Sequence, residues 1–97
     1  MKVTLHPGAV ADLQEAADFY EREGSPALAA SFLAEFRRVS RLLTEQPAIG
    51  SPRSGGRRGF PMGVFPYTLI YRAGPDEICI LVVKHDRRRP GHGARRG

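Results

Sequence analysis

Several features that would assign a chemistry at once are scarce in this 97-residue sequence. It has one cysteine, Cys79, so no disulfide can form within the chain, and the surrounding apolar run predicts a buried strand thiol. The three histidines are not spaced like metal ligands, and no glycine-rich segment leads into a Lys-Ser/Thr pair. Neither a metal site nor a phosphate-binding loop is therefore indicated, and we expect no cofactor.

Long apolar segments are also missing. No run approaches the roughly 20 residues that are needed to span a bilayer. The apolar stretch Val3–Leu5 at the N-terminus is too short for a signal peptide. We therefore expect a cytoplasmic protein without a membrane partner.

Positive charge is plentiful, and it is concentrated in the second half of the chain. Residues 1–52 hold seven acidic and five basic groups, whereas residues 53–97 hold ten basic and three acidic groups. Nine of those ten basic groups are arginine, which is favoured where planar, bidentate contacts matter. This asymmetry favours a polyanionic target or an acidic protein partner. The alternative is a solvated basic surface that serves solubility.

The first half predicts one strand and two helices. Residues 2–6 alternate like a short strand. Apolar residues then recur every three or four positions from Ala9 to Tyr20, which predicts an amphipathic helix that ends at Gly24. Its acidic residues are expected to form the outer, solvated face (Asp12, Glu15, Asp18 and Glu21). Ser25-Pro26 is typical of a second helix start, and Pro47 requires that helix to end by Gln46.

The second half predicts strands. Residues 47–66 form a loop rich in proline and glycine, with an edge strand near Arg57–Met62. Residues 67–72 and 77–84 predict a strand hairpin, and the latter should be central because it is apolar on both faces. The expected fold is α+β: an N-terminal strand and an antiparallel helical hairpin packed on a small antiparallel sheet, in the order β-α-α-β-β-β. Residues 1–90 should be one domain, and residues 91–97 a flexible basic tail.

Four stretches, in this order, carry a resemblance to a known family. They are Ala9-x-x-Asp12-Leu13-x-Glu15-Ala16 with Phe19-Tyr20-Glu21; Leu43-x-x-x-Pro47-x-x-Gly50-x-Pro52; Phe65-Pro66-Tyr67-x-Leu69-Ile70-Tyr71-Arg72; and Ile78 to His85 followed by Arg87-Arg88-x-Pro90. Their joint order and spacing resemble the RelE/ParE toxins of bacterial type II toxin–antitoxin systems, in particular the plasmid-stabilisation toxins. The resemblance covers residues 1–90.

The resemblance implies a growth-inhibiting protein that is silenced by an antitoxin, which wraps an extended or helical segment around it. It leaves two activities open. RelE-like members cleave mRNA on the ribosome without a metal, whereas ParE-like members bind and block DNA gyrase.

For the nuclease activity, a histidine can act as base or acid, and cations can stabilise the charge on the phosphorane. The candidate catalytic set is His85, Arg58, Lys84 and Arg88. Otherwise His85 is a strand-end residue that bonds a backbone carbonyl. For target or antitoxin binding, the candidates are the arginines of the later strands and the tail (Arg57, Arg58, Arg72, Arg87, Arg88 and Arg89). We expect these arginines to converge on the side of the sheet away from the helices.

Two departures count against a nuclease. RelE-like nucleases commonly carry arginine after the tyrosine that opens the penultimate strand, but here Thr68 follows Tyr67. They also use an aromatic residue in the C-terminal segment, where this chain has only His92 between two glycines. The sequence therefore favours a non-enzymatic, ParE-like toxin that binds gyrase. The alternatives are a ribosome-dependent mRNA endoribonuclease and a non-toxic protein that only binds an antitoxin.

Overall fold

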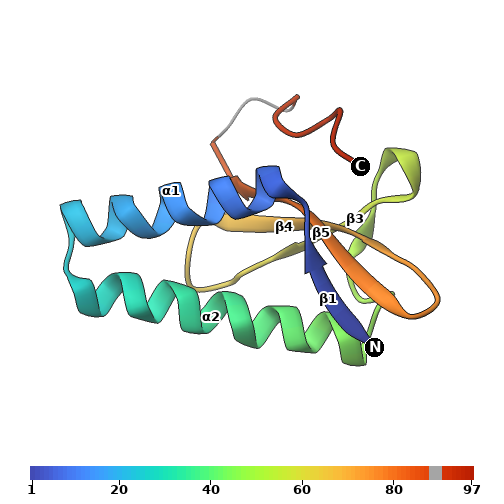
Figure 1. The fold of residues 1–97 in the computed structure, drawn as a ribbon, viewed down its shortest axis with the longest axis horizontal. Coiled ribbons are helices and arrows are strands. Elements are labelled where there is room, and N and C mark those ends of the chain that lie inside the picture. The colour runs from blue at the N-terminus through green and yellow to red at the C-terminus, as the bar shows by residue number, and fades with distance from the viewer. Residues whose placement is uncertain (88–90) are drawn as a thin grey trace.

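The computed structural model describes residues 1–87 and 91–97, so Arg88 and Arg89 lie outside the described residues. The elements follow the order β1 (Lys2–Leu5), α1 (Pro7–Glu23), α2 (Pro26–Glu45), β2 (Ser51–Pro52), β3 (Arg58–Pro61), β4 (Tyr67–Ala73) and β5 (Glu77–His85), with a short 3₁₀ turn at Ser54–Gly56. The two helices form a hairpin, and the C-terminal segment returns to the start of α1 (Figure 1). The expected α+β fold is confirmed.

Both helices begin and end at the signals that predicted them. Pro7 and Pro26 occupy the first helical positions, where their missing N–H leaves no hydrogen bond unmade. The Ser25 hydroxyl accepts a hydrogen bond from the Leu28 N–H at 3.1 Å and caps α2. The helices follow one another through Gly24 and Ser25 alone, so they pack side by side as an antiparallel pair.

The sheet has five strands in the order β1-β5-β4-β3-β2, and it is mixed rather than wholly antiparallel. β1 pairs parallel with β5, whereas the three other pairs are antiparallel. The paired residues of β1 and β5 are 75 positions apart, such as Lys2 and Glu77, so their pairing is set by the path of the helical hairpin and not by a local turn. The sequence pattern therefore predicted β1 but carried no information on its direction. The two-residue β2 was not predicted either.

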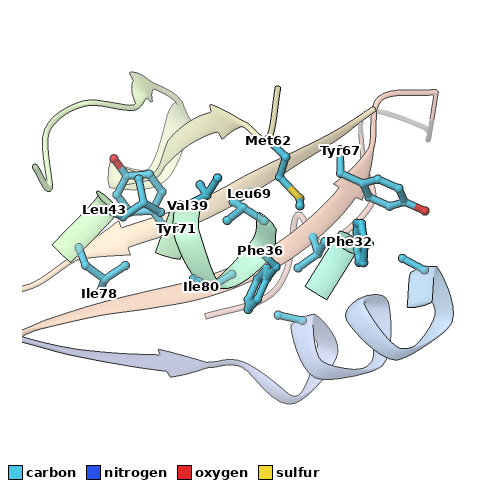
Figure 2. Close-up of a cluster of buried hydrophobic side chains, with 13 residues drawn as sticks. Phe32, Phe36, Val39, Leu43, Met62, Tyr67, Leu69, Tyr71, Ile78 and Ile80 are labelled. Atoms are coloured by element: carbon cyan, nitrogen blue, oxygen red, sulfur yellow. The ribbon is translucent and has the colours of Figure 1, made fainter. Parts of the chain in front are cut away.

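The main core lies between the helices and one face of the sheet. α2 contributes a buried stripe, and β4 and β5 contribute the strand residues that face it (Figure 2). Its largest fully buried side chains are Phe32, Val39, Leu43, Met62, Leu69, Tyr71, Ile78 and Ile80. Tyr71 also carries a polar contact, because its hydroxyl donates to the Pro47 carbonyl at 2.8 Å and accepts from the Gly50 N–H at 3.0 Å.

A β-bulge in β5 creates a second apolar cluster on the opposite face. Ile70 pairs with Val82 but Tyr71 pairs with Ile80, so Leu81 is the extra residue. Alternation from Ile80 already places Leu81 on this opposite face, and the bulge turns Val82 to the same side, where both are buried with Ile70. This bulge explains why the strand is apolar on both faces. Cys79 packs at the margin of this cluster and is half-buried, so the expectation of a buried thiol is wrong.

Residues 91–97 lie over this second face. Gly93 is in contact with Val82, and Gly97 is in contact with Leu81 and Arg72, so side chains at either glycine position would collide with the sheet. The mobility expected for this segment stays a prediction. None of the helices in the described part of the chain is long and apolar enough to span a membrane.

Candidate functional site

Asp12 is buried on α1, and it does not belong to the solvated outer face predicted for that helix. It lies three residues after Ala9 and four before Ala16, both of which are buried, so helical spacing places it on the inward stripe. Its Oδ2 accepts a hydrogen bond from the Val83 N–H at 3.1 Å. β1 ends opposite Ile80, so the Asp12 carboxylate replaces a strand partner for β5 beyond that point.

Two side chains of the C-terminal segment also bind the Asp12 carboxylate. Arg96 Nη1 is 2.5 Å from Oδ2, Arg96 Nη2 is 3.3 Å from Oδ1, and His92 Nε2 is 3.1 Å from Oδ1. Burial raises the pKa of Asp12, but the hydrogen bonds from Arg96, Val83 and His92 and the positive charge of Arg96 outweigh it. The net result is a pKa below the usual value for aspartate. The carboxylate is therefore held in its charged form.

Arg57 and Arg72 bind the backbone of the same segment. Arg57 donates to the Gly93 oxygen at 2.9 Å, to the Ala94 oxygen at 3.1 Å and to the Arg96 oxygen. Arg72 donates to an oxygen of Gly97 at 2.6 Å and to the Gly55 carbonyl at 3.0 Å. The structure thus brings these two predicted binding residues together on the face away from the helices, where each bonds its own chain.

Arg58 lies elsewhere. It pairs with Tyr71 across β3 and β4, and directly paired residues share a face of the sheet, which here is the helix-facing one. Its guanidinium donates to the Gly50 carbonyl at 2.8 Å and to the Ala48 carbonyl at 3.3 Å. Arg58 and the Tyr71 hydroxyl together fix the loop that follows α2. The expectation that Arg58 joins Arg57 and Arg72 in one patch is wrong.

His85 lies at the end of β5 in a shallow cleft on the helix side, lined also by Glu15, Phe19 and Tyr67. Its ring meets the Tyr67 ring edge-on, with the centroids 5.0 Å apart. His85 Nδ1 accepts the Arg87 backbone N–H at 3.1 Å, so a neutral ring carries its proton on Nε2. Among the described residues, His85 therefore bonds a backbone N–H, whereas the alternative to a catalytic role expected a bond to a backbone carbonyl.

The described members of the predicted nuclease set do not share one surface. Lys84 and His85 are consecutive in β5, and consecutive strand side chains point to opposite faces. Arg58 pairs with Tyr71 and His85 pairs with Tyr67, four residues along β4, which corresponds to about 13 Å. Arg87 is exposed beside His85, and its side chain forms no hydrogen bond or ion pair with another described residue.

Comparisons with known proteins agree with this architecture. The family described as "ParE toxin of type II toxin-antitoxin system, parDE" matches residues 3–90. A solved structure described as "Chromosomal ParDE TA system from P. aeruginosa" superimposes with a TM-score of 0.76 at 23% sequence identity. That match covers 88% of this chain and 95% of the other. No curated protein matches the sequence. At this identity the solved structure shows a shared fold.

Proposed function

This chain belongs to the ParE toxin family of type II toxin–antitoxin systems, and from that premise we propose that it arrests growth by binding DNA gyrase in the cytoplasm. A cognate antitoxin neutralises it in this proposal. The observation that carries the choice of a binding role is the separation of the basic groups that a nuclease would need. His85 and Lys84 face opposite sides of the sheet, and Arg58 bonds two loop carbonyls.

Metal-free RNA cleavage needs a base at the attacking hydroxyl and cations at the phosphate in one place. A lysine on the far face of a sheet cannot reach a phosphate that is held beside His85. Arg58 would have to abandon its carbonyl partners and cross about four residues of strand. The arrangement of the described residues supports recognition of a protein partner.

One observation favours the endoribonuclease alternative. The His85 cleft places an imidazole beside the carboxylate-bearing Glu15 and the phenol of Tyr67, with the exposed Arg87 next in sequence. Such a cleft brings together groups of the kind that act as general acid or base in RNA cleavage. In that reading the ribosome and its mRNA are the target, and His85 is indispensable.

A supercoiling assay with purified gyrase tests the proposal. We expect the wild-type toxin to inhibit supercoiling at micromolar concentrations and His85→Ala to inhibit equally, because no proton transfer is involved. Arg87→Ala should weaken inhibition, while Arg37→Ala, a matched exposed arginine on α2, should leave it unchanged. Unaffected supercoiling, together with ribosome-dependent mRNA cleavage that His85→Ala abolishes, would establish the nuclease instead.

A growth assay tests neutralisation. Expression of the toxin alone should stop growth, and co-expression of the protein encoded by the adjacent reading frame should restore it. Normal growth during expression of the folded toxin alone contradicts the proposed toxicity and leaves an antitoxin-binding role.

A further inference from the structure

Residues 91–97 are bound to the rest of the chain as a short peptide ligand would be. Their backbone oxygens accept hydrogen bonds from Arg57 and Arg72. Their glycines contact the second apolar cluster, which includes Leu81 and Val82. Two of their side chains are anchored at Asp12: Arg96, which is 19% exposed and binds both carboxylate oxygens, and His92, which is 20% exposed and binds Oδ1 alone.

The Asp12 end of this contact is chemically selective. A buried carboxylate is stable only when it is paired and hydrogen-bonded. The Val83 N–H and His92 each supply one bond to Asp12, and Arg96 supplies a fork that reaches both carboxylate oxygens. Arg96 Nη1 also lies 3.2 Å from the carbonyl of Leu81, the bulge residue of β5, just past the point where the pairing with β1 ends. A planar guanidinium fits this pair of acceptors better than an ammonium group does.

We propose that Asp12 and the Leu81 carbonyl form a guanidinium-binding site, which anchors residues 91–97 as a strap over the second face of the sheet. While the strap is closed, it withholds Arg57 and Arg72 from any partner, because both guanidinium groups bond strap oxygens. When the strap opens, both guanidinium groups become available to bind an acidic segment of a partner protein. The consequence for partner binding rests on the proposed function, whereas the guanidinium site does not.

The strap offers a matched pair of arginines for the test. Arg95 is exposed and Arg96 is largely buried, so the two adjacent residues differ in contacts but not in charge. The sole thiol, Cys79, reports on the covered face. It packs against Ile70, Leu81 and Val82, and it pairs with Arg72, whose guanidinium reaches Gly97.

The experiment compares full-length Arg96→Ala and Arg95→Ala with the wild type. Two rates are measured: the reaction of Cys79 with a thiol reagent, and the modification of Arg57 and Arg72 by phenylglyoxal, followed by mass spectrometry. We expect Arg96→Ala to raise these rates about tenfold, the effect of losing one charge-assisted contact, and Arg95→Ala to leave them unchanged. Arg96→Lys should fall between them. Equal rates for Arg96→Ala and Arg95→Ala overturn the proposal.

A synthetic peptide of residues 91–97 tests the site directly. Added to the Arg96→Ala protein at millimolar concentration, it should restore the slow Cys79 reaction, whereas the same peptide with alanine in place of Arg96 should not. Equal protection by both peptides, or by neither, overturns a guanidinium site. The gyrase assay is a separate measurement. If Arg96→Ala raises the rates of Cys79 and arginine modification and also inhibits gyrase more strongly than the wild type, the strap masks Arg57 and Arg72 from the target. If the strap opens but neither wild type nor variant affects gyrase, the proposed function fails and the guanidinium site stands.

Discussion

Replacement of Asp12 by alanine should be among the most damaging single changes outside the apolar core. The carboxylate joins three parts of the chain, because α1 carries it, β5 donates to it through Val83 and the C-terminal segment donates through Arg96 and His92. Alanine removes every one of these acceptors while retaining the helix. The loss of stability therefore reports on the carboxylate and not on helix propensity.

The magnitude follows from what each donor can do after the change. The Val83 N–H is enclosed beneath α1, and an unpaired buried donor costs about 1–3 kcal/mol. Arg96 is 19% exposed and belongs to a surface segment, so it can turn to water and contributes less than a trapped charge would. We expect Asp12→Ala to lower the free energy of unfolding by about 2–3 kcal/mol.

Urea unfolding of the full-length protein at pH 7 measures this loss. For a small domain the expected change corresponds to a midpoint about 1–2 M lower. Asp12→Asn is the informative companion, because its side-chain oxygen still accepts from Val83 while the charge is lost; it should cost less than Asp12→Ala. A midpoint for Asp12→Ala within experimental error of the wild type would refute the burial and the contacts described for this carboxylate.

Two further predictions concern single hydrogen-bonding side chains. Tyr71→Phe leaves the Pro47 carbonyl and the Gly50 N–H without their shared partner, so thermal unfolding should show a loss of about 1–3 kcal/mol with an unchanged far-UV spectrum; an unaltered melting temperature contradicts this. Ser25→Ala removes the cap of α2 and should cost about 1 kcal/mol in urea unfolding, with most of that loss recovered in Ser25→Asp; equal costs for the two variants contradict a capping role.

Asp12 also makes a prediction about pH. The pKa of its carboxyl is lowered in the folded protein, so the charged form stabilises the fold above the pKa of the unfolded chain, and this stabilisation is lost as pH falls through the lower folded value. The difference in unfolding free energy between wild type and Asp12→Asn should therefore be largest near pH 7 and shrink below about pH 4. A difference that stays constant from pH 7 to pH 3 contradicts an ionised, paired Asp12.

The helices were predictable because their signals are local. Ser25-Pro26 starts α2, and Gly24 and Pro47 mark helix ends within a residue or two of the observed bounds. The parallel pairing of β1 with β5 was not predictable, since no turn connects these strands. The bulge at Leu81 was equally hidden, because a run that is apolar on both faces gives no sign of where the side-chain alternation shifts.

Asp12 shows how a charge can mislead the interpretation of a helix. Its residue type groups it with Glu15 and Asp18 on a solvated face, although its spacing from Ala9 and Ala16 places it on the apolar stripe. An acidic residue at an inward position indicates a buried donor that needs an acceptor. The identity of that donor, a strand N–H beyond the end of β1, depends on tertiary pairing and has no counterpart in the sequence.

The same reasoning applies to the arginines. Their number in the second half suggested one outward-facing cationic surface, yet Arg57, Arg58 and Arg72 each donate to backbone oxygens of this chain. Backbone oxygens are present at every position, so a sequence cannot show which arginines they will engage. An arginine that donates to a backbone carbonyl keeps its charge and still attracts an anionic partner at a distance. To form a bidentate contact with a carboxylate, however, it must first break its hydrogen bonds to the carbonyl. Among the described arginines that are expected to bind a partner, Arg87 has no such hydrogen bond to give up. Its substitution should therefore weaken target binding most directly.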